Sequence, residues 1–432
     1  MTMRMEQTHP STPTASRLAA VPLAVAYLAV PLGTVLIRHM PPTDGSPFLP
    51  WVILAALGAV HAILFRRSGA RLKKRFFFEV AMFMGLVSIL FLRQKELLRQ
   101  LETFASMAPE LTPVVMLGFC WLWAVTFGLP DRAAFQRYGA ALGVLCILDL
   151  VVEILVHQAV PAMRWIGDSN VLAGLLLVAL CAGLRPGKAD GGLFEPDQGL
   201  PIWRTLILAG IMACLSRTGL FAAGWIFLCF GRGSRVVRMC VCLICFLLIG
   251  VTFLLPATPS DLSRFVDYWL WAKSLNMFSL DPSLLIFGLP LDRALPMTFP
   301  PEMTSIWEAV TGAPALFGVH LQQIPSFWLR LLLGWGLIVP LLFLSGLLIL
   351  LLRRPTRMGA GLAAAIFAQG MSTPLLYCPA LGAAMGLALF LALSASAATP
   401  LPNKKQESAP QRPEPPSRPD TDPAAQWDLR PL

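Results

Sequence analysis

Three side chains of this sequence have types that could do chemistry together: Arg217, Arg264 and His320. Arg217 stands in "IMACLSRTGLFAAGWIFL", between two apolar runs and with no acidic residue within a helical turn. Arg264 begins the aromatic stretch "RFVDYWLWAKSL", where Asp261 and Asp267 offer the alternative of a surface ion pair. His320 is isolated, which is typical either of an interfacial polar residue or of a group that transfers protons near neutral pH. The three residues are far apart in the chain, so their chemistry depends on the elements that position them.

The composition predicts a membrane protein. Of 432 residues, 56% are hydrophobic and 13% are charged, against about 25% charged in a typical soluble domain. The apolar residues form uninterrupted blocks of about 20 residues, the length that a helix needs to cross a bilayer. The net charge of +10 comes from short basic clusters between these blocks. No aromatic residues are interleaved with the clusters, which argues against nucleic-acid binding.

The apolar blocks predict an all-α polytopic integral membrane protein with about twelve transmembrane helices. We expect the spans near residues 18–37, 48–65, 76–92, 112–129, 138–157, 171–184, 202–215, 219–230, 239–255, 326–351, 359–376 and 380–395.

The basic clusters set the predicted orientation. With both termini in the cytoplasm, "RRSGARLKKR" (66–75), "GRGSRVVR" (231–238) and "RRPTR" (353–357) all lie inside, as the positive-inside rule requires. One long helix through Arg217 would separate these clusters and place a guanidinium at mid-membrane, at a cost of at least ~2.5 kcal/mol. We therefore predict a turn at 216–218, with Arg217 at the outer surface at the tip of a helical hairpin.

The transmembrane domain is predicted to cover 17–395, between a cytoplasmic N-terminal tail (1–16) and a disordered cytoplasmic tail (396–432) that is rich in proline and charge. Within the domain, 256–325 form a large outer loop, and 93–111 are expected to form an interfacial helix.

The outer loop contains a predicted amphipathic helix that lies on the membrane face or over a cavity. Its apolar positions recur at helical spacing: Phe265, Tyr268, Trp269, Ala272 and Leu275.

Motifs for nucleotide or metal chemistry are absent from the sequence. There is no Walker A sequence, no HExxH and no paired CxxC. The acidic-x-acidic triplets at 195–197 and 420–422 fall in an inner loop and in the tail, where we interpret them as solvated. Asp149 and Glu153 share a face of a predicted span, and both a functional role and pairing with an arginine stay open for them. We expect no metal and no cofactor.

Several segments combine into a pattern with a common order and a common outer placement. They are "GDSNVLAGLLLVAL" (167–180), "LSRTGLFAAGWIFL" (215–228), "RFVDYWLWAKSL" (264–275), "LLIFGLPL" (284–291) and "VHLQQIPSFWLRLLLGWGLI" (319–338). This combination resembles the O-antigen ligase and polymerase-like family of bacterial envelope glycosyltransferases.

The resemblance implies a GT-C-like fold, with a large periplasmic loop carrying short helices, in the bacterial inner membrane. It implies transfer of a glycan from an undecaprenyl-diphosphate carrier to an acceptor hydroxyl on a glycan or a lipid A-core-like molecule. Arg217, Arg264 and His320 would be catalytic. The arginines would bind the diphosphate leaving group, since guanidinium binds such oxygens in bidentate fashion, and the histidine would act as general base. The reaction would need no metal and would invert the anomeric configuration.

Substrate binding is expected to involve the same two arginines together with Asn170, Tyr268 and Trp269. The rings of Tyr268 and Trp269 could stack on sugars or anchor the loop at the membrane. Two alternatives stay open: a transporter or flippase of lipid-linked sugars, and a catalytically degenerate assembly partner. The second is suggested by departures from the family pattern, such as Leu321 in place of the usual asparagine after the histidine.

Overall fold

The computed structural model describes residues 18–38, 49–64, 108–157, 163–184, 202–231, 234–254, 263–289, 299–311, 318–353 and 356–398, with Leu291, Ala294, Leu295 and Met297 between them. The predicted span 76–92, most of the predicted interfacial helix, the predicted N-terminal tail and residues 399–432 of the predicted C-terminal tail lie outside these residues. Residues 396–398 of that tail belong to the last helix, which corrects the predicted start of the tail. The described chain is almost entirely helical, with one two-stranded hairpin, β1 (Met163–Arg164) and β2 (Gly167–Asp168), in which Met163 pairs with Asp168 and Arg164 with Gly167.

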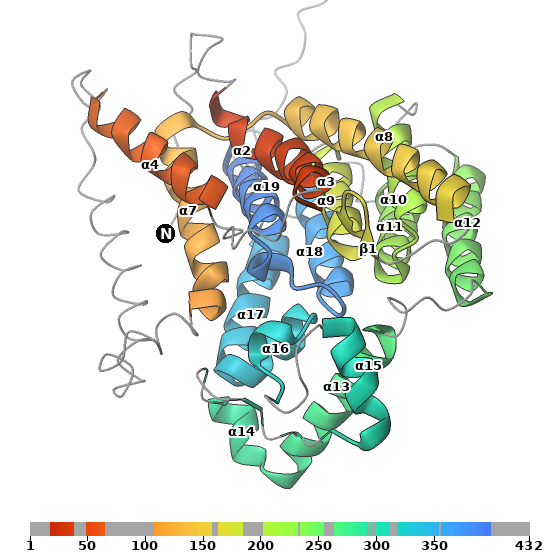
Figure 1. The fold of residues 1–432 in the computed structure, drawn as a ribbon. Helices are drawn as coiled ribbons and strands as arrows, with labels where there is room; N and C mark the ends of the chain where they lie inside the picture. The colour runs from red at the N-terminus through yellow and green to blue at the C-terminus, as the bar shows by residue number, and fades with distance from the viewer. Residues whose placement is uncertain are drawn as a thin grey trace, which may run out of the picture.

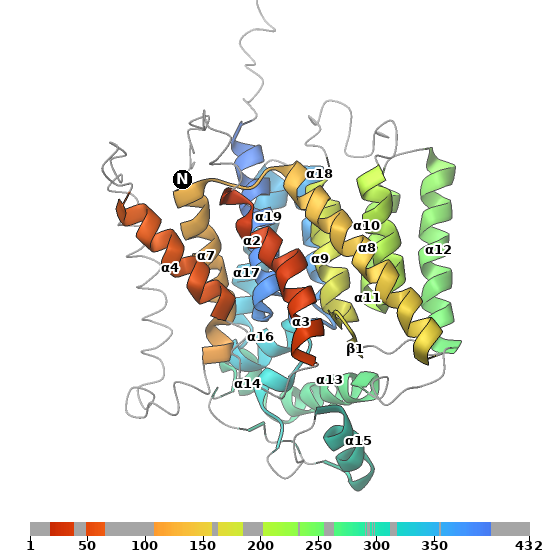
Figure 2. The ribbon, with the colours of Figure 1, turned by 45° about the horizontal axis from the view of Figure 1, so that its top comes forward.

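Most helices form one bundle (Figures 1 and 2). Its elements are α2 (Val21–Ala24), η1 (Val25–Ala29), α3 (Val30–Arg38), α4 (Leu49–Leu64), α7 (Thr112–Phe127), α8 (Arg132–His157), α9 (Ser169–Ala182), α10 (Ile202–Cys214), α11 (Arg217–Phe230), α12 (Arg235–Leu254), α17 (Ile338–Arg353), α18 (Arg357–Gln369) and α19 (Pro379–Ala398).

Helix α9 forms the centre of the bundle. Every residue from Leu172 to Ala182 is buried, and α8, α10, α11, α18 and α19 all pack against this helix. Small residues permit close packing nearby: a Cβ on Gly210 of α10 would lie 2.5 Å from the Cα of Gly143 in α8. Small residues at helix contacts are the usual means by which membrane helices approach each other closely.

Three helices among the described residues are long and apolar enough to cross a bilayer: Pro109–Phe127, Arg132–Val156 and Arg235–Leu254. Several shorter apolar helices accompany them, including α9, α10 and α11. Helix α12 turns apolar side chains outward, with Leu247 61% and Leu254 84% exposed. These features are consistent with membrane association, while the number of twelve spans stays a prediction.

The remaining helices lie across one end of the bundle (Figure 2). They are α13 (Ser263–Leu280), α14 (Pro282–Phe287), α15 (Pro301–Thr311) and α16 (Phe327–Trp335), with the 3-10 turns η4 (Ala108–Leu111), η8 (Leu321–Gln323) and η9 (Leu375–Tyr377). The large loop predicted at 256–325 therefore does carry short helices.

The chain turns between α10 and α11, as predicted. Helix α10 ends at Cys214, Leu215 adopts a left-handed φ of 53°, and Ser216 caps the start of α11. Because the Ser216 hydroxyl contacts the start of α9, and Arg204 near the start of α10 contacts Gly183 at the end of α9, α10 and α11 run in opposite directions.

The predicted single span at 326–351 is wrong, because the chain breaks there into α16 and α17. The break lies at Gly336, whose φ is +69°, a conformation that glycine adopts without steric cost. Two backbone hydrogen bonds join the break to the end of α14: Leu289 N to Leu333 O (2.7 Å) and Leu337 N to Leu285 O (2.7 Å).

Candidate functional site

The candidate site is the end of the bundle at which α9 and α11 begin, α12 ends and α13 lies across the helix termini (Figure 2). The segments predicted to carry function are far apart in sequence, and the structure brings their helices to this one end. Hydrogen bonds between side chains and backbone join most of them.

Asn170 and Ser216 form the first link. Asp168 caps α9, its Oδ1 accepting hydrogen bonds from the backbone N–H groups of Asn170 (2.6 Å) and Val171 (3.1 Å). The Ser216 hydroxyl donates to Asn170 Oδ1 (2.7 Å) and accepts from Gly219 N (3.2 Å). Asn170 thus joins α9 to the turn between α10 and α11, and its side-chain oxygen accepts the hydrogen bond that makes this link.

The loop after α18 forms the second link. Gln369 is 1% exposed and donates through Nε2 to Asn170 O (2.7 Å) and to Thr373 Oγ1 (2.9 Å). The hydroxyls of Thr218 and Ser372 lie 2.7 Å apart and share a hydrogen bond. We call this group of Asn170, Ser216, Thr218, Gln369, Ser372 and Thr373 the polar shelf.

Burial affects the carboxyl group beside the polar shelf. Desolvation raises the pKa of Asp168, and the hydrogen bonds from Val171 and Asn170 act against this increase. The carboxyl group therefore holds its proton more tightly than a solvated aspartate does.

Arg217, which has no acidic residue near it in the sequence, is held against the end of α12. Its Nε donates to Thr252 Oγ1 (2.9 Å), and its Nη2 donates to Thr252 O (3.2 Å). Its Cζ lies 3.6 Å from the ring centroid of Phe253. A cation beside carbonyls at a helix C-terminus is electrostatically favourable, and an aromatic ring face also attracts it.

Helix α13 lies over the polar shelf. Trp271 donates through Nε1 to Met371 O (3.3 Å), and Val266 and Leu270 are buried on the inner face. Arg264 lies in the first turn of α13, and its side chain falls outside the described residues.

The two aromatic residues predicted to bind sugar lie differently from one another. Tyr268 is 76% exposed. Trp269 is partly buried and stacks on Phe299, with ring centroids 5.0 Å apart and an angle of 16° between the planes. Trp269 therefore packs inside the large loop, whereas Tyr268 faces outward.

His320 stands immediately before η8, with its side chain partly exposed. Its backbone N–H donates to Gln323 Oε1 (2.8 Å), and Gln323 N donates to His320 O (3.0 Å). The start of α16 then contacts the loop of the polar shelf: Ser326 Oγ donates to Gly370 O (3.2 Å) and Phe327 N to Thr373 O (3.2 Å). His320 thereby belongs to the same end of the bundle as the other predicted site residues.

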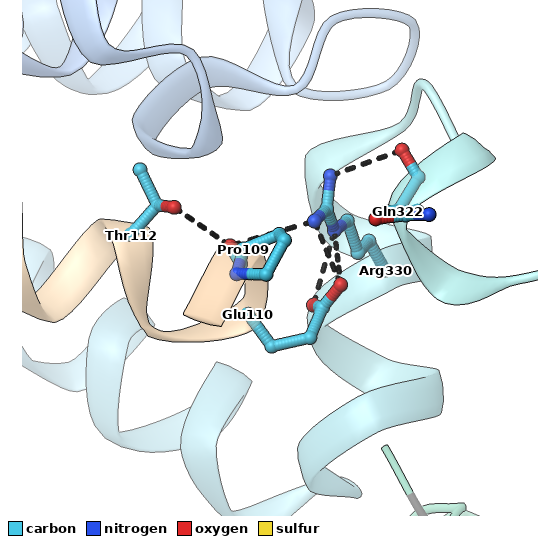
Figure 3. Close-up of polar contacts among 5 residues, drawn as sticks. All are labelled: Pro109, Glu110, Thr112, Gln322 and Arg330. Carbon is cyan, nitrogen blue, oxygen red and sulfur yellow. Dashed lines mark hydrogen bonds and ion pairs between the residues drawn. The ribbon is translucent and has the colours of Figure 1, made fainter. Parts of the chain in front are cut away.

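A buried ion pair contacts the turn that follows this histidine (Figure 3). The sequence-based prediction does not include it. Arg330 donates to Glu110 through Nε (3.1 and 3.0 Å to the two carboxylate oxygens) and Nη2 (2.7 Å). The two side chains are 6% and 2% exposed. The Arg330 Cζ also lies 4.0 Å from the ring centroid of Tyr377. An arginine inside the apolar run "FWLRLLL" was the available signal, since such a charge needs a partner.

Among the described residues, no group of three or more His, Cys, Asp or Glu side chains converges as a metal site would require. Asp149 and Glu153 are buried in α8 at 6% and 2% exposure, and both have interaction partners.

Comparisons with known proteins add no family assignment. A scan against protein-family models finds no match to this chain. A search of the curated proteins also finds no significant match. The resemblance to the O-antigen ligase and polymerase-like family therefore depends on the sequence motifs alone.

Proposed function

We propose that this protein is a glycosyltransferase that moves a glycan from an undecaprenyl-diphosphate carrier to an acceptor hydroxyl, at the end of the bundle that carries the polar shelf. One observation carries the proposal: helices α9, α11 and α13 and the turn with His320, which contain Asn170, Arg217, Arg264 and His320, gather at the same end of the bundle. Such a gathering suits a one-sided active site better than a pathway through the membrane.

The ends of the described chain support an outer location for this site. Thr34 of α3 donates to Trp165 O in the β1–β2 hairpin that precedes α9 (3.4 Å), so α2, at the start of the described residues, lies toward the opposite end of the bundle. Helix α19 likewise runs away from the site toward its C-terminal end (Figure 2). With both termini in the cytoplasm and about twelve spans, the site would face the periplasm.

The chemistry proposed for this end is a direct displacement. The acceptor oxygen attacks the anomeric carbon, the bond from that carbon to the diphosphate oxygen breaks, and the lipid diphosphate leaves with the electron pair. His320 takes the proton of the acceptor hydroxyl. Arg217 stabilises the negative charge that develops on the diphosphate, and its contacts with Thr252 and Phe253 fix its orientation before the ligand binds.

Transfer by the purified protein tests this proposal. The donor is an undecaprenyl-diphosphate oligosaccharide, the acceptor is either a second donor molecule or a lipid A-core, and the readout is release of undecaprenyl diphosphate. Arg217→Ala and Arg264→Ala should each lower the rate by about 10²–10³, as expected for loss of a group that stabilises charge in the transition state. His320→Ala should lower the rate by about 10²–10⁴, as expected for loss of a general base. Added chelator should leave the rate unchanged.

Arg238→Ala is the matched control, because Arg238 is a buried arginine (7% exposed) near the start of α12, at the opposite end of that helix from Thr252. This variant should transfer glycan at nearly the wild-type rate per folded molecule. Wild-type rates in all three site variants would refute the mechanism. Movement of an intact labelled donor across a vesicle membrane, without release of lipid diphosphate, would instead establish the transporter.

A further inference from the structure

The guanidinium of Arg330 joins three short turns that are distant in sequence. In addition to Glu110 in η4, it contacts Gln322 O in η8 through Nη1 (3.4 Å) and Pro109 O through Nη2 (3.5 Å). The ring of Tyr377 in η9 covers one of its faces. Figure 3 shows this cation joining the start of α7 to the turn after His320. The ring of Tyr377 adds the turn before α19 to the same contact.

A buried ion pair is a costly way to stabilise a fold. Removing two charges from water has a high cost, and well-packed apolar side chains often stabilise a fold as well as a buried ion pair does. An ion pair of this kind adds geometric specificity, because a planar guanidinium that donates to several acceptors at once fixes their relative positions. Among these acceptors, Gln322 O belongs to the residue two positions after His320, the proposed general base.

We propose that Arg330 is a positioning residue, which acts through Gln322 to hold the turn that carries His320. This inference deepens the proposed function and depends on it for the role of His320. Glu110 in turn holds the guanidinium by three donor–acceptor contacts of 2.7 to 3.1 Å. Loss of the contact to Gln322 should leave His320 in a turn with more than one position.

The primary test measures the exposure of His320 without measuring catalysis. Diethyl pyrocarbonate modifies the protein in detergent at a single pH, and mass spectrometry gives the rate at His320, with the other histidines of the chain as internal standards. Arg330→Lys keeps a charge that can pair with Glu110 but lacks the planar fork that also reaches Gln322. We expect modification at His320 to become about tenfold faster, which corresponds to about 1.4 kcal/mol.

Two further variants make the test independent of folding defects. Glu110→Leu with Arg330→Met removes both charges together, so neither remains buried alone, and it should also accelerate modification at His320. Arg238→Met removes a buried arginine at the opposite end of α12 and should leave His320 unchanged. Rates at His320 equal to wild type in both Arg330 variants would overturn the positioning role.

Glycan transfer by the same variants separates this inference from the proposed function. If Arg330→Lys lowers transfer and shifts its pH profile while the thermal unfolding temperature stays near wild type, the positioning role in the reaction is supported. If Arg330→Lys transfers at the wild-type rate with an unchanged pH profile, that role is refuted. If the wild type itself transfers no glycan yet His320 becomes more reactive in Arg330→Lys, the proposed function fails and Arg330 still positions the turn.

Discussion

The substitution Gly336→Ala should release α14 from the break between α16 and α17. Gly336 has a φ of +69°, and a Cβ built there would lie 2.1 Å from the backbone oxygen of Ile286. A Cβ on the facing Gly288 would lie 2.7 Å from Gly334 O and from Gly336 N. The two glycines therefore allow two backbone segments to touch, and no rotamer change can relieve the clash.

The expected magnitude follows from two contributions. Gly336 has a ψ of −172°, so alanine there would occupy a region that is essentially restricted to glycine, at a cost of about 1–3 kcal/mol. The backbone must also separate, which breaks the two hydrogen bonds between 285–289 and 333–337, each with a net contribution of about 1 kcal/mol. Together these give a loss of about 3–5 kcal/mol in the free energy of unfolding of this region. Release of α14 should also lower glycan transfer, because α14 directly follows α13.

Unfolding in mixed micelles by titration with dodecyl sulfate measures this effect, with tryptophan fluorescence as the signal. Gly346→Ala and Gly250→Ala are matched controls, since a Cβ at either position meets nothing within 4 Å; both lie in helices, where alanine is favoured by about 0.5–1 kcal/mol. The reasoning is refuted if Gly336→Ala unfolds at the same detergent fraction as these controls.

Three further predictions concern the same end of the bundle. Because the folded protein raises the pKa of Asp168 above its ordinary value of 3.8, stability should fall as the pH rises from that value toward the pKa of the folded state, and stay low above it. Asp168→Asn keeps a helix cap and should flatten this fall in thermal melts recorded from pH 3.8 upward. Tyr377→Leu should lower the melting temperature, because it removes a desolvated cation–π contact with Arg330 worth about 2 kcal/mol. Tyr377→Phe keeps the ring face and should melt like the wild type. Equal melting temperatures of the two variants would contradict this reasoning. Ser216→Ala should cost about 1–2 kcal/mol in the same melts, because it removes a helix cap and the bond to Asn170, and Ser216→Thr should restore part of it.

The positions of the bundle helices could be predicted from the sequence because hydropathy and charge are local signals. The apolar blocks match α9, α10, α11 and α19 within a few residues. The turn before Arg217 could also be predicted, since only a hairpin keeps the basic clusters on one side. The gathering of the site segments at one end follows from the same count.

Contacts between distant segments could not be predicted in this way. The sequence stays apolar through Gly334, Trp335 and Gly336, so hydropathy gives no sign of a break there. The break is instead accompanied by close backbone contact with Gly288, which lies 48 residues before Gly336. The partner of Arg217 is Thr252, 35 residues later. An uncharged hydroxyl and a backbone carbonyl carry no sequence signal that would mark them as the partners of an arginine.

The pairing of Glu110 with Arg330 also sets an order of events during synthesis. The two residues are 220 positions apart, so at about 5–20 residues per second Glu110 is made roughly 11–44 s before its partner exists. During that interval the Glu110 side chain has no Arg330 to pair with, so the start of α7 should stay open to water. Chains arrested before residue 330 should therefore leave a cysteine at position 110 open to a water-soluble maleimide, and full-length chains should protect it. The start of α7 is thus completed by a residue from the last quarter of the sequence.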